Sequence, residues 1–426
     1  MTRLAIITHE PIAELMAGPA ILALEMAGAL TDTADPVLAT PYPVARVLPD
    51  GVSARTYAFG NERSLAAIVE DADAMLVQGY TLEKFPWLAE CGIPVIVDLY
   101  CPFQFENLER LRCIDGSASD AEAAVTMDHD VLVAQLQRGD FFICASDRQR
   151  DMWLGTLYAL GRLTLDAYRG DPVARDLIDV VPFGISEEPP QRTKPTYRGR
   201  IDGIGPTDRL VVWGGSVLEW QDPLTVLEAV GQVATREASI RFVLPGGDHP
   251  NPDVPPMPVL GRLRARAESL GLLDRHVFFA PWIPYDERGA YLVEADLGVS
   301  AHRLTLETRF AWRTRMLDYV WAALPIVCSA GDSFAEIVAT RQLGKVVAPG
   351  DPNAMADAML ELLHNPGLAV ACRTRLAELR HELTWTRAVE PIRRYLRHPT
   401  QRATVAKTRS TAAGRRPRWS RWLIGR

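Results

Sequence analysis

Residues 294–338 read EADLGVSAHRLTLETRFAWRTRMLDYVWAALPIVCSAGDSFAEIV, and this stretch decides the fold class. Its apolar runs at 297–300 and 325–329 predict two buried strands, and the amphipathic pattern over 313–323 predicts a helix between them. A charged loop follows the first strand, and a second helix follows the second strand. This alternation is typical of an α/β protein with a parallel sheet and crossover helices.

Charged residues gather in this stretch at the positions where a parallel sheet binds its ligands. Such ligands lie beyond the carboxyl ends of the strands, beside loops and helix N-termini. The loop after the first strand holds Glu307 and Arg309. We expect Ser333 to start the second helix, because Glu336 follows it in a capping-box spacing. The stretch therefore predicts a phosphate-binding site.

The length of 426 residues predicts two domains, because one hydrophobic core seldom supports so long a chain. Hydrophobic residues make up 48% of the chain and charged residues 23%, which is ordinary for a soluble globular protein. The six cysteines are scattered without a C-x-x-C pair or a His/Cys cluster, which favours reduced thiols in the cytoplasm and argues against a zinc site. The N-terminus turns polar too early for a signal peptide, and no apolar run approaches the length of a membrane span.

Charge is concentrated in the C-terminal tail, residues 399–426, which contains eight Lys and Arg and no acid. The rest of the chain carries −15 when this +8 is subtracted from the net charge of −7. Basic residues alternating with Trp419 and Trp422 predict contact with an anionic lipid surface on the inner face of the cell membrane. A disordered solubilising tail is the alternative. The acidic body argues against nucleic acid as a partner.

The first half of the chain predicts a Rossmann-like domain, because short apolar runs alternate with helix-like segments. These runs cover residues 4–10, 37–40, 74–78, 94–99 and 141–146. Gly18 precedes Pro19 at a predicted helix start, where the backbone could approach a ligand; an ordinary loop-to-helix junction is the alternative. Asp98, Tyr100 and Glu106 follow a strand and suit contact with an acceptor, with solvated loop groups as the alternative.

A second cycle of strands and helices begins after a connection rich in Pro, Gly and charge. The run 210–215 predicts a buried strand that ends in Gly214 and Gly215. Asp222 is a predicted N-cap with Pro at the first helical position. Trp282 ends a later strand, and residues 384–396 predict a terminal amphipathic helix.

The order of these motifs resembles that of GT-B glycosyltransferases. The second half carries WGG, WQDPLTVLEA, LPGG, PYDERGAYLVEADLGVS, ETRFAWRTRMLDYVWAALPIV and GDSFAEIV. The first half carries AGPAILALEMAGAL, VIVDLYCPFQFENLE and ICASDRQRDMWLG. The chain is most similar to the family 4-like retaining enzymes of bacterial surface-polysaccharide clusters.

The resemblance implies an α/β fold in which two Rossmann-like domains face a cleft and a C-terminal helix crosses back to the first domain. It implies an acceptor domain, a linker, a nucleotide-sugar donor domain, a crossover helix and a basic tail. In that order these segments cover residues 1–185, 186–208, 209–383, 384–398 and 399–426.

The resemblance places Gly214 and Gly215 in the loop that faces the donor phosphates. The basic pair common after these glycines is absent, and Ser216 and Gln221 stand there instead. We expect the missing charge to come from Arg309, Arg313 or Arg315. Residues two apart on a helix diverge, so Arg313 and Arg315 are not both expected to touch phosphate.

Two acids and a tryptophan complete the site that the resemblance implies. Asp318 occupies the place of the glutamate that binds the donor ribose, with an i,i+3 salt bridge to Arg315 as the alternative. Glu307 resembles the acid that contacts the sugar, although its spacing to Asp318 is longer than the usual E-x7-E. Trp282 is expected to line the base pocket, unless it is a core residue.

These features together predict a retaining hexosyltransferase that moves a sugar from a nucleotide diphosphate sugar to a cell-envelope or polyprenyl-linked glycan acceptor. The resemblance implies no cofactor and no metal, with the donor phosphate helping to deprotonate the acceptor hydroxyl. The expected catalytic residues are Glu307, Arg309, Arg315 and Asp98. A nucleotide-sugar epimerase and a degenerate, membrane-associated assembly partner are the alternatives. The sequence does not identify the sugar, base, acceptor or oligomeric state.

Overall fold

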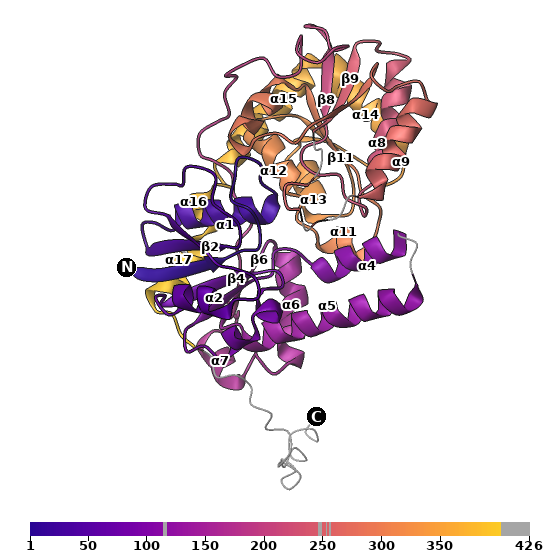
Figure 1. Ribbon diagram of the computed structural model, residues 1–426. Coiled ribbons are helices and arrows are strands. Elements are labelled where there is room, and N and C mark those ends of the chain that lie inside the picture. Colours follow the sequence, from indigo (N-terminus) through magenta and orange to yellow (C-terminus); the bar gives the residue numbers. More distant parts are fainter. Residues whose placement is uncertain (114–116, 246–248, 253, 255–256, 402–426) are drawn as a thin grey trace, which may run out of the picture.

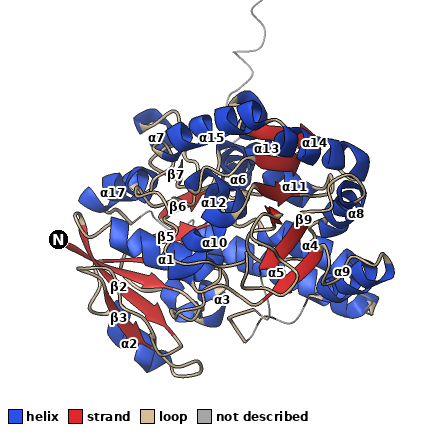
Figure 2. Cartoon of the chain, turned by 90° about the horizontal axis from the view of Figure 1, so that it is seen from above, coloured by secondary structure: helices blue, strands red, loops and turns tan. Residues whose placement is uncertain are grey.

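The computed structural model describes residues 1–401 except 114–116, 246–248, 253, 255 and 256. Within them the chain forms two parallel sheets, each covered by helices on both faces (Figures 1 and 2). The predicted α/β architecture of two Rossmann-like domains is therefore confirmed. Most of the tail, residues 402–426, lies outside the described residues, so its membrane contact stays a prediction.

The first sheet has seven parallel strands in the order β3-β2-β1-β4-β5-β6-β7. Its central strands are buried on both faces, which is why they read as continuous apolar runs rather than alternating patterns. The strands are β1 (Thr2–Ile7), β2 (Ala34–Thr40), β3 (Ser53–Thr56), β4 (Ala74–Gln78), β5 (Val95–Asp98), β6 (Phe141–Cys144) and β7 (Ile178–Val180). The helices are α1 (Gly18–Ala29), α2 (Glu62–Val69), α3 (Thr81–Lys84), η1 (Pro86–Ala89), α4 (Phe103–Cys113), α5 (Ala118–Arg138), α6 (Asp147–Ala159) and α7 (Leu165–Gly170).

The second sheet has six parallel strands in the order β10-β9-β8-β11-β12-β13. The strands are β8 (Arg209–Val212), β9 (Ile240–Pro245), β10 (Val277–Ala280), β11 (Leu297–Ser300), β12 (Ile326–Ser329) and β13 (Gly344–Val347). The helices before the crossover are α8 (Pro223–Ala234), α9 (Pro258–Ser269), η2 (Tyr285–Glu287), α10 (Arg288–Glu294), α11 (Leu306–Phe310), α12 (Thr314–Trp321), α13 (Ser333–Thr340), α14 (Pro352–His364) and α15 (Pro366–Arg380). The strand order reverses between β8 and β11, and ligands of such sheets bind at this switch point.

The stretch 294–338 forms the predicted strands and helices, with two corrections. Glu307 and Arg309 lie on the short helix α11 rather than in a loop. The cap of α13 is Asp332 instead of Ser333, because the Asp332 carboxylate accepts the N–H of Ala335 at 2.7 Å. Both corrections lie in the connections, where single side-chain contacts decide the local conformation.

The chain returns to the first domain through α16 (Trp385–Ala388) and α17 (Glu390–Arg397), coloured yellow beside α1 in Figure 1. Where it crosses, the Ile185 N–H donates to Leu383 O at 2.9 Å and the Trp385 N–H donates to Ile185 O at 3.2 Å. Farther on, Tyr395 stacks on Phe141 of β6 with ring centroids 4.7 Å apart. The terminal helix predicted at 384–396 is thus two short helices, and both pack on the first domain.

Candidate active site

A cavity of about 450 Å³ lies between the two domains, beyond the carboxyl end of β8. Helix α12 and the glycine loop after β8 line one wall, and the start of α1 and the loop before α4 line the other. Seven of the residues predicted for the site line this cavity: Gly18, Gly214, Gly215, Trp282, Arg313, Arg315 and Asp318. Glu307, Arg309 and Asp98 are not among its lining residues.

The glycine loop is fixed by a tyrosine that the sequence analysis did not identify. Tyr319 on α12 accepts the N–H of Gly214 at 2.8 Å and donates to the Val299 carbonyl of β11 at 2.8 Å. This hydroxyl joins the ends of β8 and β11 at the switch point. Gly214 therefore gives its amide to Tyr319 and not to a ligand. Gly215 adopts a φ of +70°, and its amide has no hydrogen-bond partner among the described residues.

Arg315 brings an uncompensated positive charge to this loop. Its Nη2 donates to the Ser216 carbonyl at 2.8 Å, and its guanidinium lies 4.1 Å from the ring centroid of Trp213. Its Nη1 is buried without a hydrogen-bond partner, and no ion pair to it is found within the described ranges. Burial, with a contribution from the charge of Arg313, lowers the pKa of Arg315 to about 10. The site therefore holds a cation that lacks an anion.

Arg313 differs from Arg315 because its charge is already neutralised. Its Nη1 and Nη2 donate to the two carboxylate oxygens of Glu307 at 2.7 and 2.8 Å, and its Nε lies 3.5 Å from Asp332. Glu307 is fully buried in this bidentate pair. The carboxylate predicted to contact the sugar thus holds Arg313 in place.

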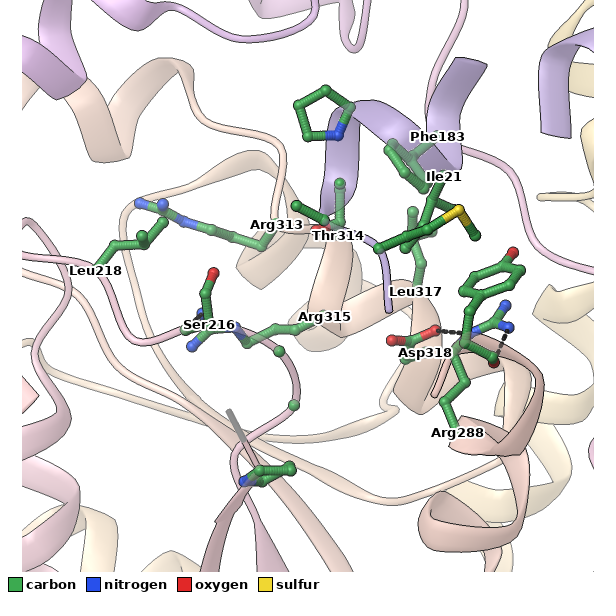
Figure 3. A pocket seen from close by; sticks show the side chains of 18 of the residues that line it. Ile21, Phe183, Ser216, Leu218, Arg288, Arg313, Thr314, Arg315, Leu317 and Asp318 are labelled. Carbon is green, nitrogen blue, oxygen red and sulfur yellow. Dashed lines mark hydrogen bonds and ion pairs between the residues drawn. The ribbon is translucent and has the colours of Figure 1, made fainter. Parts of the chain in front are cut away.

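Asp318 lies in the middle of α12 and lines the cavity (Figure 3). Its carboxylate pairs with Arg288, Nε to Oδ1 at 3.4 Å, so the alternative pairing with Arg315 is wrong. Arg288 is itself held between the rings of Tyr285 and Trp321, with centroid distances of 3.8 and 4.5 Å. Burial raises the pKa of Asp318, and the charge of Arg288 opposes that rise. The helix thus presents a cation near its start and a carboxylate one turn later.

The first domain supplies the opposite wall. Gly18 begins α1, and a Cβ atom there would lie 4.0 Å from the Tyr100 hydroxyl. Glu106 extends from α4 into the cavity and accepts the thiol of Cys101, Sγ to Oε2 at 3.0 Å. Burial and the nearby charge of Glu307 raise the pKa of Glu106 to about 7. Glu106 is therefore the carboxyl of this wall that suits an acceptor hydroxyl.

Asp98 and Arg309, two of the residues expected to be catalytic, are not among the lining residues of the cavity. Asp98 is buried at the end of β5, where it accepts the N–H of Tyr100 at 3.0 Å and the Nε2 of Gln78 at 3.2 Å. Burial raises the pKa of Asp98 to about 7. Its carboxylate therefore shapes the turn that carries Tyr100. Arg309 is exposed on α11.

Trp282 joins the two walls. Its Nε1 donates to the Met16 carbonyl of the first domain at 3.3 Å, and its ring meets His249 edge to face at 5.6 Å. The indole lines the cavity, so a role beside a nucleobase stays a prediction.

The described residues contain no group of three or more His, Cys, Asp and Glu side chains placed to hold a metal ion. No helix in the described part of the chain is long and apolar enough to cross a membrane.

Comparisons with known proteins agree with this geometry. Residues 208–365 match the family model "Glycosyl transferases group 1". No curated protein matches the sequence. Among solved structures, sucrose-phosphate synthase from Thermosynechococcus elongatus is 14% identical, with a TM-score of 0.64 and coverage of 93% of this chain and 98% of that one.

Two further structures resemble the chain as closely. WaaG, a glycosyltransferase involved in lipopolysaccharide biosynthesis, is 14% identical, with a TM-score of 0.61 and coverage of 92% and 98%. HepE from Anabaena, in complex with UDP and glucose, is 13% identical, with a TM-score of 0.63 and coverage of 93% and 100%. The second domain is thus a group 1 glycosyl transferase domain, and the chain is a glycosyltransferase of the GT-B fold.

Proposed function

We propose that this glycosyltransferase is a retaining enzyme of the family 4-like type that uses a nucleotide diphosphate sugar without a metal ion. The observation that carries the proposal is Arg315, a buried cation with no acid partner beside the glycine loop. A diphosphate leaving group gains negative charge as the sugar bond breaks, and a preorganised cation in a dry site stabilises it. HepE, which shares the fold, was solved with UDP and glucose.

Three groups are placed to hold the diphosphate. The amides of Gly215 and Ser216 have no partner among the described residues, and the start of α12, at Arg313, Thr314 and Arg315, lines the same cavity. Arg315 adds the full positive charge. Asp318, farther along α12, would accept hydrogen bonds from the ribose hydroxyls of the donor.

The acceptor would enter against the first domain. Glu106 and Tyr100 offer polar groups on this wall, and its lining contains no cation within the described ranges. We assign Glu106 the role of orienting the attacking hydroxyl, whose proton then passes to the donor phosphate on the same face. WaaG, which shares the fold, acts in lipopolysaccharide biosynthesis. By that similarity we propose a cell-envelope or lipid-linked glycan as acceptor, with the basic tail on an anionic membrane surface.

The test is titration calorimetry of the full chain with UDP, GDP, ADP and dTDP, each with and without EDTA. We expect one nucleotide to bind unchanged by EDTA, and Arg315→Ala to weaken that binding about 100-fold. Arg309→Ala is the matched control, because this arginine is exposed and lies outside the cavity. No binding by any nucleotide, or equal binding by both variants, would refute the proposal.

A further inference from the structure

A second hollow of about 440 Å³ lies where the two domains meet, outside the cleft. We call it the seam groove, and the residues that define it are Phe105, Leu108, Arg112, Arg303, Leu304 and Leu306. Helix α4 of the first domain forms one side, and the segment entering α11 forms the other. The helices α4 and α11 are neighbours in Figure 1. Nothing in the proposed catalysis uses this groove.

Three leucines of the seam groove face solvent. Leu304 is 72% exposed, Leu306 57% and Leu108 44%. Single exposed leucines are common, but here three of them line one hollow, and clustered exposed apolar side chains are a feature of binding sites. The groove therefore favours a ligand with an apolar chain.

The charges around the groove favour an anionic group on that ligand. Arg303 makes no ion pair or side-chain hydrogen bond with any described residue, and Arg309 is exposed on the adjoining helix α11. Arg112 is paired with Glu109 at 2.5 Å, and Glu307 is committed to Arg313. The acids of the groove are thus neutralised, and the excess charge is positive.

A buried ion pair connects the groove with the cleft. Glu307 borders the groove and holds Arg313, which lines the cleft. On the same seam Phe105 of α4 stacks on Phe310 of α11 with centroids 5.6 Å apart. A ligand in the groove would therefore lie one buried ion pair away from the reaction site.

We propose that the seam groove binds the apolar chain and phosphate of a lipid-linked acceptor, with the chain on the leucines and the phosphate on Arg303. This inference rests on the proposed function, because it gives the acceptor's anchor a place beside the sugar-transfer cleft. An arginine presents several donors to one phosphate, and the leucines gain by leaving water.

The experiment uses lysophosphatidic acid, a single acyl chain with a phosphate monoester, titrated below its micellar concentration into the full chain. Inorganic phosphate and dodecyl maltoside separate the phosphate from the chain. We expect lysophosphatidic acid to bind at least 10-fold more tightly than either, since it alone carries both groups. The double variant Leu304→Ser, Leu306→Ser and the single variant Arg303→Ala should each lose about 10-fold in affinity.

Val370→Ser is the matched control, because this residue is 62% exposed on α15 and lies outside the groove. All groove variants should keep wild-type nucleotide affinity and melting temperature. Equal lipid affinity in wild type and groove variants, including binding through the tail alone, would overturn the proposal. A chain that binds lysophosphatidic acid in the groove but no nucleotide would refute the proposed function and leave the groove assignment standing.

Discussion

The two walls of the cleft differ in charge. The wall from the second domain presents three arginines, Arg288, Arg313 and Arg315. The described lining residues of the first domain include no Lys, Arg or His, and instead present the carboxyl groups of Glu10 and Glu106. Under the proposed function, the donor phosphates and the acceptor hydroxyl would therefore bind to opposite walls and would not compete for the same groups.

The three arginines also differ among themselves. Asp318 compensates Arg288, and Glu307 compensates Arg313, whereas Arg315 has no acid among the described residues. Arg288 and Arg313 therefore stabilise the wall through ion pairs, and the charge of Arg315 is available to a ligand. The predictions below test this division of roles.

The largest expected effect is on stability, from breaking the pair that builds the wall. Glu307→Ala leaves Arg313 buried without its bidentate partner, which should lower the free energy of unfolding by about 3–5 kcal/mol. Urea denaturation measures the change. Glu382→Ala, which breaks an exposed pair with Arg341, should cost at most about 1 kcal/mol. Equal losses in both variants would contradict a structural role for the buried pair.

The next effect is on catalysis, from removing the uncompensated cation. Arg315→Met should reduce kcat/KM by about 100-fold, because the leaving group loses its charge stabilisation. Stability should not fall, since the substitution removes a buried charge that has no acid partner among the described residues. Steady-state kinetics and a thermal melt measure the two quantities. A destabilised variant with normal kcat/KM would mean that Arg315 has a structural role, like Arg288 and Arg313.

A smaller effect is expected in the middle of α12. Asp318→Asn should weaken nucleotide binding by about 10-fold, the typical loss for a charged hydrogen bond. Calorimetry with the bound nucleotide and with its 2′,3′-dideoxy analogue measures where the loss arises. The analogue should bind wild type and variant alike. If the variant weakens both ligands equally, Asp318 acts through Arg288 and not through the ribose.

The smallest effect concerns the first wall and its pH dependence. The pKa of Glu106 is about 7 in the folded protein, above its ordinary value of 4.5, so folding favours the protonated carboxyl. The folded state then binds more protons than the unfolded state between these values, and stability falls as pH rises through this window. At pH 8 the free energy of unfolding of Glu106→Gln should be about 1 kcal/mol higher than that of wild type, a value reduced because the cleft is open to solvent. At pH 4.5 the two proteins should have the same free energy of unfolding.

Asp98 keeps its own raised pKa in both proteins and cancels from this comparison. Denaturation curves across the pH range give the answer. A difference between the two proteins that does not change with pH would show that Glu106 does not titrate in this window.

The sequence could predict elements whose signal is local. The strands β11 and β12 are buried on both faces, so their apolar runs predicted them correctly. The cap of α8 was also predicted correctly, because Asp222 accepts the N–H of a residue only three positions later. Helix α4 has no buried residue, so its sequence has no apolar stripe from which the helix could be predicted.

The site was predictable where it follows the ends of strands, and not where distant residues meet. Gly215, Arg315 and Asp318 lie in the cavity because they follow β8 or begin α12. The bond from Gly214 to Tyr319 joins residues 105 positions apart, which no spacing reveals. Arg309 was expected in a loop beside the phosphates, but it lies exposed on α11 and does not line the cavity.

The return of the chain to the first domain has a consequence for synthesis. Because α16 and α17 pack on α1 and β6, the first domain lacks part of its packing until residue 397 has been made. Domains usually fold as they leave the ribosome, N-terminal first. Here the N-terminal domain should be the last to finish, since it waits for the entire second domain to be translated. A nascent chain cut before Trp385 would leave Phe183 in contact with Tyr100 but without the ring of Trp385, so this late segment completes the packing of the first domain.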